Sequence, residues 1–373
     1  MEYIEGAAAL EALALRLHET NLLAADTEAA GYHRFRDRVC LLQLSTRTET
    51  FVVDTLAVPA LTPLATVFGD DKRELVFHDA DYDLRLLNRD FGLRVRKLFD
   101  TKLAAQFLGE PAFGLGALAE KYLGIALEKK HQRADWAQRP LPAPLLEYAA
   151  EDTRHLPALR DRLRELLTER GRLHWAEEEF RLVQDTRWLR DGLNNDAYLK
   201  VKGARDLNQR QLAALRELHA WREEVAEARD AASFRVLSND GLLEIARLLP
   251  TNALQLAGLK GVSASLIERR APEMIGAVRR ALELSEQTLP AFPRAPRRPP
   301  PDPSFDERMD RIRRVRDQAA DELGLDRGFL MPRTQLEALA RQQPKSAAEL
   351  GHVPDIRQWQ VEILADRLLG EMT

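Results

Sequence analysis

Two acidic residues, Asp26 and Glu28, stand two positions apart at the end of an apolar segment, NLLAADTEA. If this segment is a strand, side chains two apart project from the same face. Most D-x-E pairs in acidic sequences lie on solvated surfaces, but here leucines and alanines lead into the pair. Paired acids at the end of a buried strand are unfavourable unless a cation compensates them. Asp26 and Glu28 are therefore candidate metal ligands.

A second group of acids lies in FHDADYDLRLL, where a strand gives way to a helix. Asp79, Asp81 and Asp83 can each cap that helix, since acids near a helix N-terminus satisfy free amides and favour the dipole. Helical periodicity separates them, because Asp83 shares a face with Leu86 and Leu87. We therefore expect Asp83 to point inward as a third functional acid and Asp81 to be the N-cap.

Tyr148 and Asp152 stand four positions apart in LLEYAAEDTRHL, a segment that is predicted to be helical. This spacing places them on one helix face, which Leu145, Ala149 and Leu156 make partly apolar. Taken alone, the motif most often describes an aromatic residue and an exposed acid on an ordinary helix. On an inward face, however, Asp152 needs a compensating partner, as Asp26 and Glu28 do.

Short apolar segments predict the strands that must carry the first acids. An amphipathic helix is expected to precede them at the N-terminus. Three strands follow almost consecutively and two later ones alternate with helices, which predicts an α/β domain with a mixed sheet and flanking helices. From Ala143 onward no segment is typical of a strand, and the rest of the chain is predicted to be helical. The predicted strands are residues 21–29, 39–46, 49–56, 74–80 and 96–102.

Two breaks divide the chain into predicted domains. A polar stretch, RDGLNNDAYLKVKGARD, follows the α/β domain, and the proline-rich stretch QTLPAFPRAPRRPPPDPSF is incompatible with a helix interior or a strand. We therefore expect an α/β domain at residues 1–190, an all-α helical bundle at 204–286, a linker at 287–304 and a second helical bundle at 305–373.

The composition, 45% apolar and 31% charged, is typical of a globular protein, and no apolar run is long enough to span a bilayer. Glu2 and Glu5 occupy positions where a secretory signal carries Lys or Arg, so we expect a cytoplasmic protein without a membrane partner. The single cysteine, Cys40, excludes an intrachain disulfide and a zinc site built from cysteines alone.

The net charge of −4 gives no global attraction to nucleic acid, so any binding must use local basic patches or metal ions. Residues 294–316 hold eight arginines and four acids, a local excess of four positive charges. Such a stretch is either a solvated linker or a patch that contacts RNA, and the sequence favours neither.

The motifs together resemble the DEDD exonuclease superfamily, in the branch with tyrosine in its last motif. DTKLAAQFLGEPAFGLGALAEKYLG and KKHQRADWAQRPL resemble the ribonuclease D family, and this likeness runs through nearly the whole first domain. LNQRQLAALRELHAWREEVAEARD, VLSNDGLLEIARLLP and LKGV resemble an HRDC module. GLDRGFLMPRTQLEALARQQPKS and IRQWQVEILADRLL resemble the second, more divergent HRDC module of that family.

The resemblance implies a ribonuclease H-like fold and a 3′-5′ exoribonuclease that releases nucleoside 5′-monophosphates by two-metal-ion hydrolysis. Carboxylates without a Cys or His cluster suit Mg²⁺ or Mn²⁺. By the family pattern, Asp26, Glu28 and Asp152 hold the first ion, Asp26 also reaches the second, and Asp83 acts partly through water. Tyr148 orients the water that attacks the terminal phosphodiester.

The expected partner is RNA with a free 3′ end, in particular tRNA precursors, and no obligate protein partner is evident. The helical modules are expected to hold RNA. A DNA 3′-5′ exonuclease, or a nucleic-acid-binding protein with an inactive nuclease domain, are the alternatives. Six further residues could contact phosphates or stack on a base, although a structural role is as common for each. They are His78, Lys129, Lys130, Arg133, Trp136 and Arg139.

Overall fold

The computed structural model of the 373-residue chain describes residues 1–128, 130–131, 133–188, 196–293 and 302–372. The chain forms two compact units. The first contains Met1–Glu28, Val39–Trp188 and Pro300–Thr373, and the second contains Ala29–Arg38 and Leu189–Pro299. The first unit thus combines the α/β domain with the C-terminal helices.

A six-stranded mixed sheet is the centre of the first unit, with strand order β1-β4-β3-β2-β5-β6. β3 and β4 are antiparallel, whereas β1 runs parallel to β4, and β5 runs parallel to both β2 and β6. Every residue of β3, β4 and β5 is buried, as their apolar sequences predict. The strands are β1 (Glu2–Ile4), β2 (Leu22–Ala29), β3 (Val39–Ser45), β4 (Thr50–Asp54), β5 (Glu74–Phe77) and β6 (Leu98–Asp100).

All five predicted strands are present, but the sequence did not reveal β1. This strand has three residues, too few for an alternating pattern, and it exists because it pairs in parallel with β4. Among the described residues no strand follows Asp100, which confirms the prediction of an all-helical remainder.

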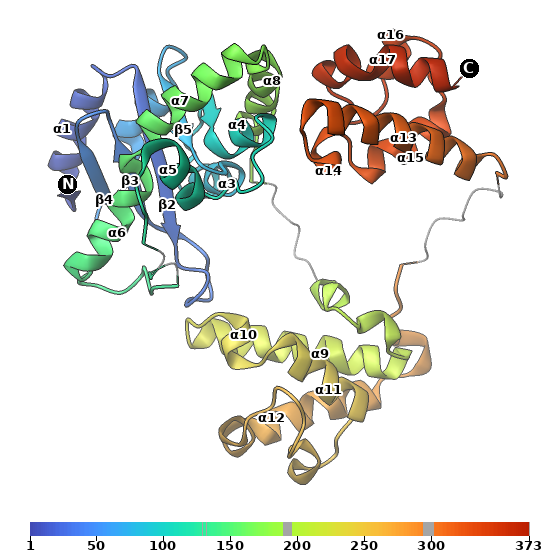
Figure 1. The fold of residues 1–373 in the computed structure, drawn as a ribbon. Helices are drawn as coiled ribbons and strands as arrows, with labels where there is room; N and C mark the ends of the chain where they lie inside the picture. The colour runs from blue at the N-terminus through green and yellow to red at the C-terminus, as the bar shows by residue number, and fades with distance from the viewer. Residues whose placement is uncertain (129, 132, 189–195, 294–301, 373) are drawn as a thin grey trace. The chain divides into compact units, whose positions relative to one another are not determined.

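Helices cover the sheet and supply the rest of the α/β domain (Figure 1). The longest of these helices, α7, buries Leu159, Leu163 and Leu167 at helical spacing. The helices are α1 (Ala7–Leu17), α2 (Ala65–Phe68), α3 (Asp81–Phe91), α4 (Thr101–Phe107), α5 (Leu115–Leu123), α6 (Ala143–Arg154), α7 (Leu156–Glu169) and α8 (Leu173–Gln184). Short 3-10 helices span Thr62–Leu64, Ala197–Lys200, Ala204–Asp206, Ala253–Leu256 and Glu286–Thr288.

The second unit is a helical bundle with its own apolar core, in which Leu215, Trp221 and Met274 are buried. Its longest helices are α9 and α12, and a capping box of Asn208 and Gln211 begins α9. The α-helices are α9 (Gln209–Ala228), α10 (Ser233–Val236), α11 (Asn239–Leu248) and α12 (Ala264–Glu283).

The C-terminal helices pack into the same core as the α/β domain. The indole of Trp359 lies edge-on to the ring of Phe107, with ring centroids 5.1 Å apart, and 6.1 Å from the ring of Trp175. Because these rings share one buried cluster, the second helical module belongs to the same compact unit as the α/β domain. Its helices are α13 (Phe305–Leu323), α14 (Arg327–Leu330), α15 (Arg333–Gln342), α16 (Ala347–Gly351) and α17 (Gln358–Met372).

Polar contacts fix the orientation of α17 against α8. The carboxylate of Glu178 accepts hydrogen bonds from the backbone N–H groups of Gln358 at 2.7 Å and Trp359 at 2.9 Å. These amides belong to the first turn of α17, which has no partner of its own for them within the helix. Glu179 accepts from the indole N–H of Trp359 at 3.0 Å and from Arg357 at 2.9 Å.

A close backbone approach completes this interface. Gly109 has a positive φ of +72°, and a Cβ atom at this position would lie 2.0 Å from the carbonyl oxygen of Gly324. Only glycine fits at position 109, because any side chain would collide with a backbone atom that has no rotamer to change.

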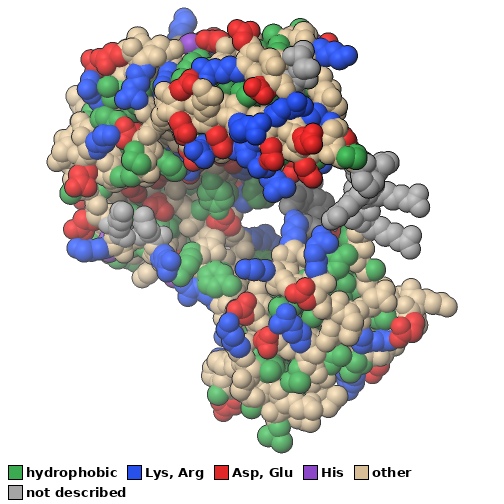
Figure 2. All heavy atoms as spheres, turned by 45° about the vertical axis from the view of Figure 1, so that its right-hand side comes forward, with side chains coloured by type: hydrophobic (Ala, Val, Ile, Leu, Met, Phe, Trp, Pro, Cys, Tyr) green, Lys and Arg blue, Asp and Glu red, His purple; other side chains and the backbone are tan. Residues whose placement is uncertain are grey.

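The surface carries mixed charge. Figure 2 shows one face, on which Lys and Arg side chains lie among Asp and Glu side chains. No helix of the described residues combines the length and the apolarity needed to cross a bilayer.

We predict that Glu178→Ala destabilises the protein by about 1–2 kcal/mol, because it removes the side-chain cap of α17. Urea unfolding of the full chain measures this. Glu362→Ala is the matched control: its carboxylate accepts from His174 across the same interface, but both side chains are more than half exposed, so its removal should cost less than about 0.5 kcal/mol. Equal destabilisation in the two variants would contradict the cap.

Candidate active site

β2 brings Asp26 and Glu28 to one place. Leu22, Leu23 and Ala24 are buried in the sheet and pair with β5, and the strand becomes partly accessible from Asp26 onward. Side chains two apart on a strand share a face. The acids therefore lie side by side at the carboxyl end of a buried strand, as the sequence predicts.

α6 brings Tyr148 and Asp152 to the same place. Ala149, Ala150 and Thr153 form the buried face of this helix. The Thr153 hydroxyl lies 2.8 Å from that of Ser45 on β3, which fixes the helix against the sheet. Tyr148 and Asp152 stand beside this buried face and are half-buried, which matches the semi-buried face expected from their spacing.

Asp26, Glu28 and Asp152 each offer a carboxylate oxygen, and these three atoms lie within 4.8 Å of one another. They line a cavity of about 540 Å³ together with Tyr148 and His78. Three oxygen donors and open space beside them are the arrangement that Mg²⁺ and Mn²⁺ accept, since these ions keep water and substrate ligands as well. The residues present therefore fit a divalent cation.

Asp83 lies beside this group and is held from another direction. Its side chain is buried and accepts a hydrogen bond from the Thr27 hydroxyl, on the strand residue between the two β2 acids. The expected inward orientation of Asp83 is thus confirmed. The expectation that Asp81 is the N-cap was wrong: Ala80 precedes the helix, and the carboxylate of Asp81 accepts from Arg85 instead.

Burial raises the pKa of every carboxyl in this cluster, and the charges of nearby acids add to the effect. Burial raises the pKa of Asp83 to about 7 and, with the charge of Glu151, that of Asp152 to about 7. Burial and the charges of the neighbouring acids raise the pKa of Asp26 and of Glu28 well above the usual range. A nearby cation would relieve this repulsion, so the electrostatics favour metal binding.

Asp100 positions the residues around the cluster without belonging to it. Its buried carboxylate accepts from the backbone N–H of Asp79 at 3.2 Å and of Ala80 at 2.8 Å, just before α3. It also accepts from Lys102 at 2.8 Å and Leu103 at 3.1 Å, and so caps α4. One side chain thereby joins the beginnings of two helices, one of which carries Asp83.

His78 is a wall of the cavity and is held by the same corner of the fold. Its Nδ1 lies 2.9 Å from the hydroxyl of Thr101, the first residue of α4. Burial lowers the pKa of His78 to about 4, so the ring is neutral at neutral pH. His78 therefore adds no positive charge beside the carboxylates.

The proposed substrate contacts after α5 divide into two kinds. Trp136 is buried and stacks against Tyr148, with ring centroids 6.2 Å apart. Its ring therefore packs against the tyrosine and is not exposed for stacking on a base. The guanidinium of Arg139 forms a bidentate ion pair with the carboxylate of Asp54, in which each hydrogen bond is 2.6 Å long. Arg139 therefore has a structural role. Both residues therefore have the structural roles that the sequence left open as the alternative to substrate contact.

The other candidates in this loop stay open. Lys130 and Arg133 are exposed, and Lys130 forms an ion pair with Glu128 at 3.2 Å. Lys129 lies outside the described residues.

Sequence reasoning missed the part of the cavity lining that comes from α5 and the loop after it. Leu115, Gly116 and Ala117, at the beginning of α5, line the cavity together with Leu127 and Glu128. The first N–H groups of a helix have no partner within the helix, and this end of the helix dipole is positive. The Gly-rich segment FGLGAL is compatible with a helix start, but its sequence does not indicate which surface that helix start faces.

We predict that metal affinity rises as the pH is raised through about 7, where Asp83 and Asp152 lose their protons. Unfolded carboxyls titrate near 4, so between about pH 4 and 7 the metal-free folded protein holds protons that the unfolded chain has lost. Raising the pH through this window removes those protons and destabilises the metal-free fold. A bound cation supplies the positive charge that the protons supplied, so the metal-bound fold is not destabilised in this way.

Thermal unfolding with and without Mn²⁺ measures this effect. The gain in Tm from Mn²⁺ should be small near pH 5.5 and large near pH 8. Asp152→Asn should abolish the gain and raise the Tm of the metal-free protein near pH 8, because it removes one repelling charge. A gain that is independent of pH would contradict the assignment.

We predict that Asp100→Asn lowers Mn²⁺ affinity although Asp100 is no ligand, because an amide can no longer accept all four backbone N–H groups. The loss of stability should be about 1–3 kcal/mol. Calorimetric titration at a temperature where the variant is folded separates the two effects. Asp79→Asn is the control, since Asp79 is an exposed neighbour whose carboxylate pairs with Lys102 and accepts none of these four backbone N–H groups. Unchanged metal affinity in Asp100→Asn would show that Asp100 serves stability alone.

Comparison with protein families identifies the parts of the chain. Residues 1–168 match the family described as 3′-5′ exonuclease, and residues 211–278 and 305–371 each match the HRDC domain. The first match contains Asp26, Glu28, Tyr148 and Asp152, which line the cavity, and Asp83, which lies beside them.

Among proteins of similar sequence, rat exosome complex component 10 is 35% identical over 269 residues, which is 70% of this chain but 30% of that protein. The chain thus spans about a third of the length of such relatives. Ribonuclease D of Pseudomonas paraeruginosa is 32% identical over 354 residues, which is 94% of this chain and 92% of that protein.

Solved structures agree over the whole length. A Bifidobacterium adolescentis protein superimposes with a TM-score of 0.84 and 25% identity, covering 100% of this chain and 97% of that one. Escherichia coli ribonuclease D superimposes with a TM-score of 0.71 and 27% identity, covering 100% and 98%. The carboxylate cluster, the order of the domains and the near-complete match to ribonuclease D lead to one conclusion: the chain belongs to the ribonuclease D family.

Proposed function

We propose that this chain is a metal-dependent 3′-5′ exoribonuclease that releases nucleoside 5′-monophosphates from RNA 3′ ends. The observation that carries the proposal is the meeting of Asp26, Glu28 and Asp152 within 4.8 Å, in a cavity that Tyr148 also lines. The exonuclease match over residues 1–168 supports it. The cavity, about 540 Å³, has room for a terminal nucleotide, which favours cleavage at an end of the chain over cleavage within it.

Asp26, Glu28 and Asp152 would hold Mg²⁺ or Mn²⁺, and we propose two ions with Asp83 completing the set. When bound, these ions supply an activated water and neutralise charge on the phosphate and on the departing 3′ oxygen. Asp83 has a less direct part, since Thr27 occupies one of its carboxylate oxygens and Asp83 does not line the cavity.

Tyr148 would place the attacking water through its hydroxyl. Burial, with the charges of Asp152, Glu28 and Asp26, raises the pKa of this hydroxyl, so it stays protonated at neutral pH. A protonated hydroxyl can accept a hydrogen bond from the water while donating to a phosphate oxygen. The rings of Trp136 and His131 hold Tyr148 from two sides, at centroid distances of 6.2 and 5.5 Å.

The beginning of α5 would receive the anionic end of the substrate. Leu115, Gly116 and Ala117 present a helix N-terminus to the cavity, where free N–H groups and the dipole favour phosphate and ribose oxygens. His78, which is neutral and also lines the cavity, can hydrogen-bond to the substrate without competing with the metals.

We propose structured RNA with a free 3′ end as the substrate, and tRNA precursors as the first to test. The Escherichia coli relative is described as an exoribonuclease involved in structured RNA processing. The cytoplasm is the compartment we propose, because the single buried thiol of Cys40 needs no oxidising environment.

We predict that Asp152→Asn lowers kcat by roughly 10³-fold or more, because it removes a metal ligand without changing the shape of the side chain. Glu151→Gln is the control: it removes the adjacent charge, which pairs with Arg154 and His155 and does not line the cavity. Mononucleotide release from RNA with Mn²⁺ measures both variants. Comparable activity in Asp152→Asn and the parent would contradict the metal assignment.

We predict that Tyr148→Phe keeps metal affinity and loses roughly 10²-fold in kcat, since only the hydroxyl aimed at the water is removed. Tyr122→Phe removes a hydroxyl from a tyrosine outside the cavity and should be near parental. Matched RNA and DNA oligonucleotides with free 3′ ends decide the sugar preference. Faster release from DNA would replace the RNA proposal with the DNA alternative.

A further inference from the structure

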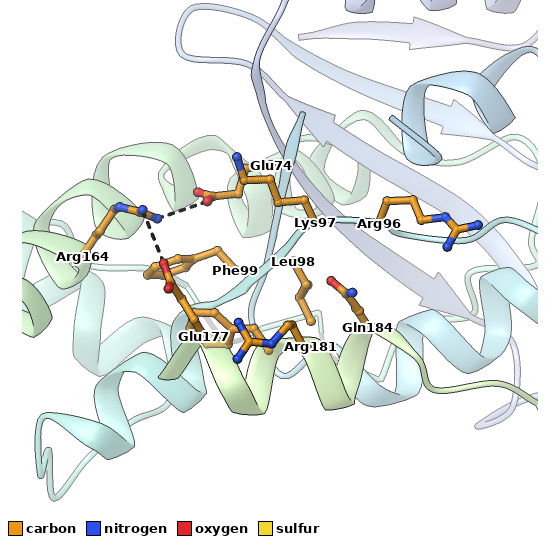
Figure 3. A pocket seen from close by; sticks show the side chains of 10 residues that line it. Glu74, Arg96, Lys97, Leu98, Phe99, Arg164, Glu177, Arg181 and Gln184 are labelled. Carbon is orange, nitrogen blue, oxygen red and sulfur yellow. Dashed lines mark hydrogen bonds and ion pairs between the residues drawn. The ribbon is translucent and has the colours of Figure 1, made fainter. Parts of the chain in front are cut away.

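A second pocket lies in the same unit at the other end of the sheet (Figure 3). It has a volume of about 280 Å³ and lies where β5 and β6 begin, against α8. Leu22 of β2 pairs with Glu74 of this pocket, and Asp26 stands four residues further along β2. At about 3.3 Å per residue the two sites are separated by roughly 13 Å along the strand. This pocket is therefore distinct from the carboxylate cavity.

The acids of this pocket are already neutralised. Arg164 lies 3.2 Å from the carboxylate of Glu74 and 3.5 Å from that of Glu177, and Figure 3 shows it reaching both. Arg160 also pairs with Glu74 and lies over the ring of Phe99, 5.5 Å from its centroid. Arg160 and Arg164 thus neutralise the charges of Glu74 and Glu177, and these four side chains add no net negative charge to the pocket.

Three further cations of the pocket have no acidic partner. Arg96, Lys97 and Arg181 are exposed, line the pocket and form no ion pair or side-chain hydrogen bond within the described ranges of the chain. Most arginines of the described residues do have an acidic partner. In α13, for example, Arg308, Arg313 and Arg316, three of its five arginines, contact aspartates.

Two buried aromatic rings also line the pocket. The rings of Phe99 and Phe180 pack with centroids 4.8 Å apart. A concave site with packed rings in its lining and three unpaired cations has the chemistry of a phosphate-binding site, and the side chain of Gln184 adds hydrogen-bonding capacity.

We propose that this pocket, lined by Arg96, Lys97 and Arg181, binds a backbone phosphate of the RNA whose 3′ end occupies the carboxylate cavity. This proposal rests on the proposed function. A stacked strand advances about 3.4 Å per nucleotide, so at least about four nucleotides must separate the two contacts. The pocket therefore acts on long substrates and leaves a dinucleotide untouched.

The test replaces all three cations in the full chain, as Arg96→Gln, Lys97→Gln and Arg181→Gln together. The control triple is Arg16→Gln, Arg47→Gln and Arg162→Gln, which removes the same charge from exposed residues of the α/β domain that each have an acidic partner. Thermal unfolding verifies that both variants fold. RNA binding is measured with the metal chelated, so that the reading does not depend on hydrolysis.

We expect the pocket triple to weaken binding of an unstructured long RNA roughly tenfold, and the control triple to have little effect. The salt dependence of log Kd should become shallower by about 0.7 for each RNA phosphate that the variant no longer neutralises. With Mn²⁺ present, KM for the long RNA should rise with kcat unchanged, and dinucleotide hydrolysis should stay parental. Absence of hydrolysis in the parent would defeat the proposed function and leave the binding comparison readable.

Two outcomes overturn the proposal. Equal RNA affinity and salt slope in the pocket triple, the control triple and the parent would show that the pocket takes no RNA phosphate. A free nucleotide offers the same chemistry, so nucleoside 5′-monophosphate and inorganic phosphate are titrated calorimetrically with the metal chelated. Loss of nucleotide binding in the pocket triple, with RNA affinity unchanged, would assign the pocket to a small ligand instead.

Discussion

Four carboxylates that repel one another, held together in a partly dry site, are the constraint on which this structure depends. The pKa of each of Asp26, Glu28, Asp83 and Asp152 is raised, which means that the metal-free fold disfavours the charges that catalysis needs. The sheet and α6 must therefore be stable enough to keep the acids in place before a cation arrives. A buried strand, a helix fixed by Thr153 and a helix start held by Asp100 provide that stability.

The sequence predicted the parts of the site that follow from side-chain periodicity. Asp26 and Glu28 on a strand, and Tyr148 and Asp152 on a helix, lie as their spacings of two and four require. Periodicity also identified Asp83 as the inward acid. Periodicity could not show whether Asp81 caps α3. The position of the helix start depends on the backbone before α3, and the carboxylate of Asp81 is taken by Arg85.

The features that the sequence could not reveal depend on partners far along the chain. Asp100 acts through four backbone N–H groups, and backbone groups carry no sequence signature. The sequence suggested a phosphate contact for Arg139, but its guanidinium pairs with the carboxylate of Asp54, which is distant in sequence. β1 needed its pairing with β4, and the C-terminal helices looked independent because a proline-rich stretch precedes them. Local pattern predicts elements well, whereas docking is decided by surfaces that form only on folding.

The close approach of Gly109 to Gly324 has a consequence for how such proteins can diverge. A backbone-to-backbone contact leaves no side chain to compensate a change, so the loop after α4 and the end of α13 must be inherited as a compatible pair. If this C-terminal module were moved into a relative with a bulkier residue at position 109, that residue would collide with the backbone at Gly324 before any side chain of the module mattered. Recombination between family members is therefore expected to preserve this pair, while the second unit, which has its own core, can be exchanged more freely.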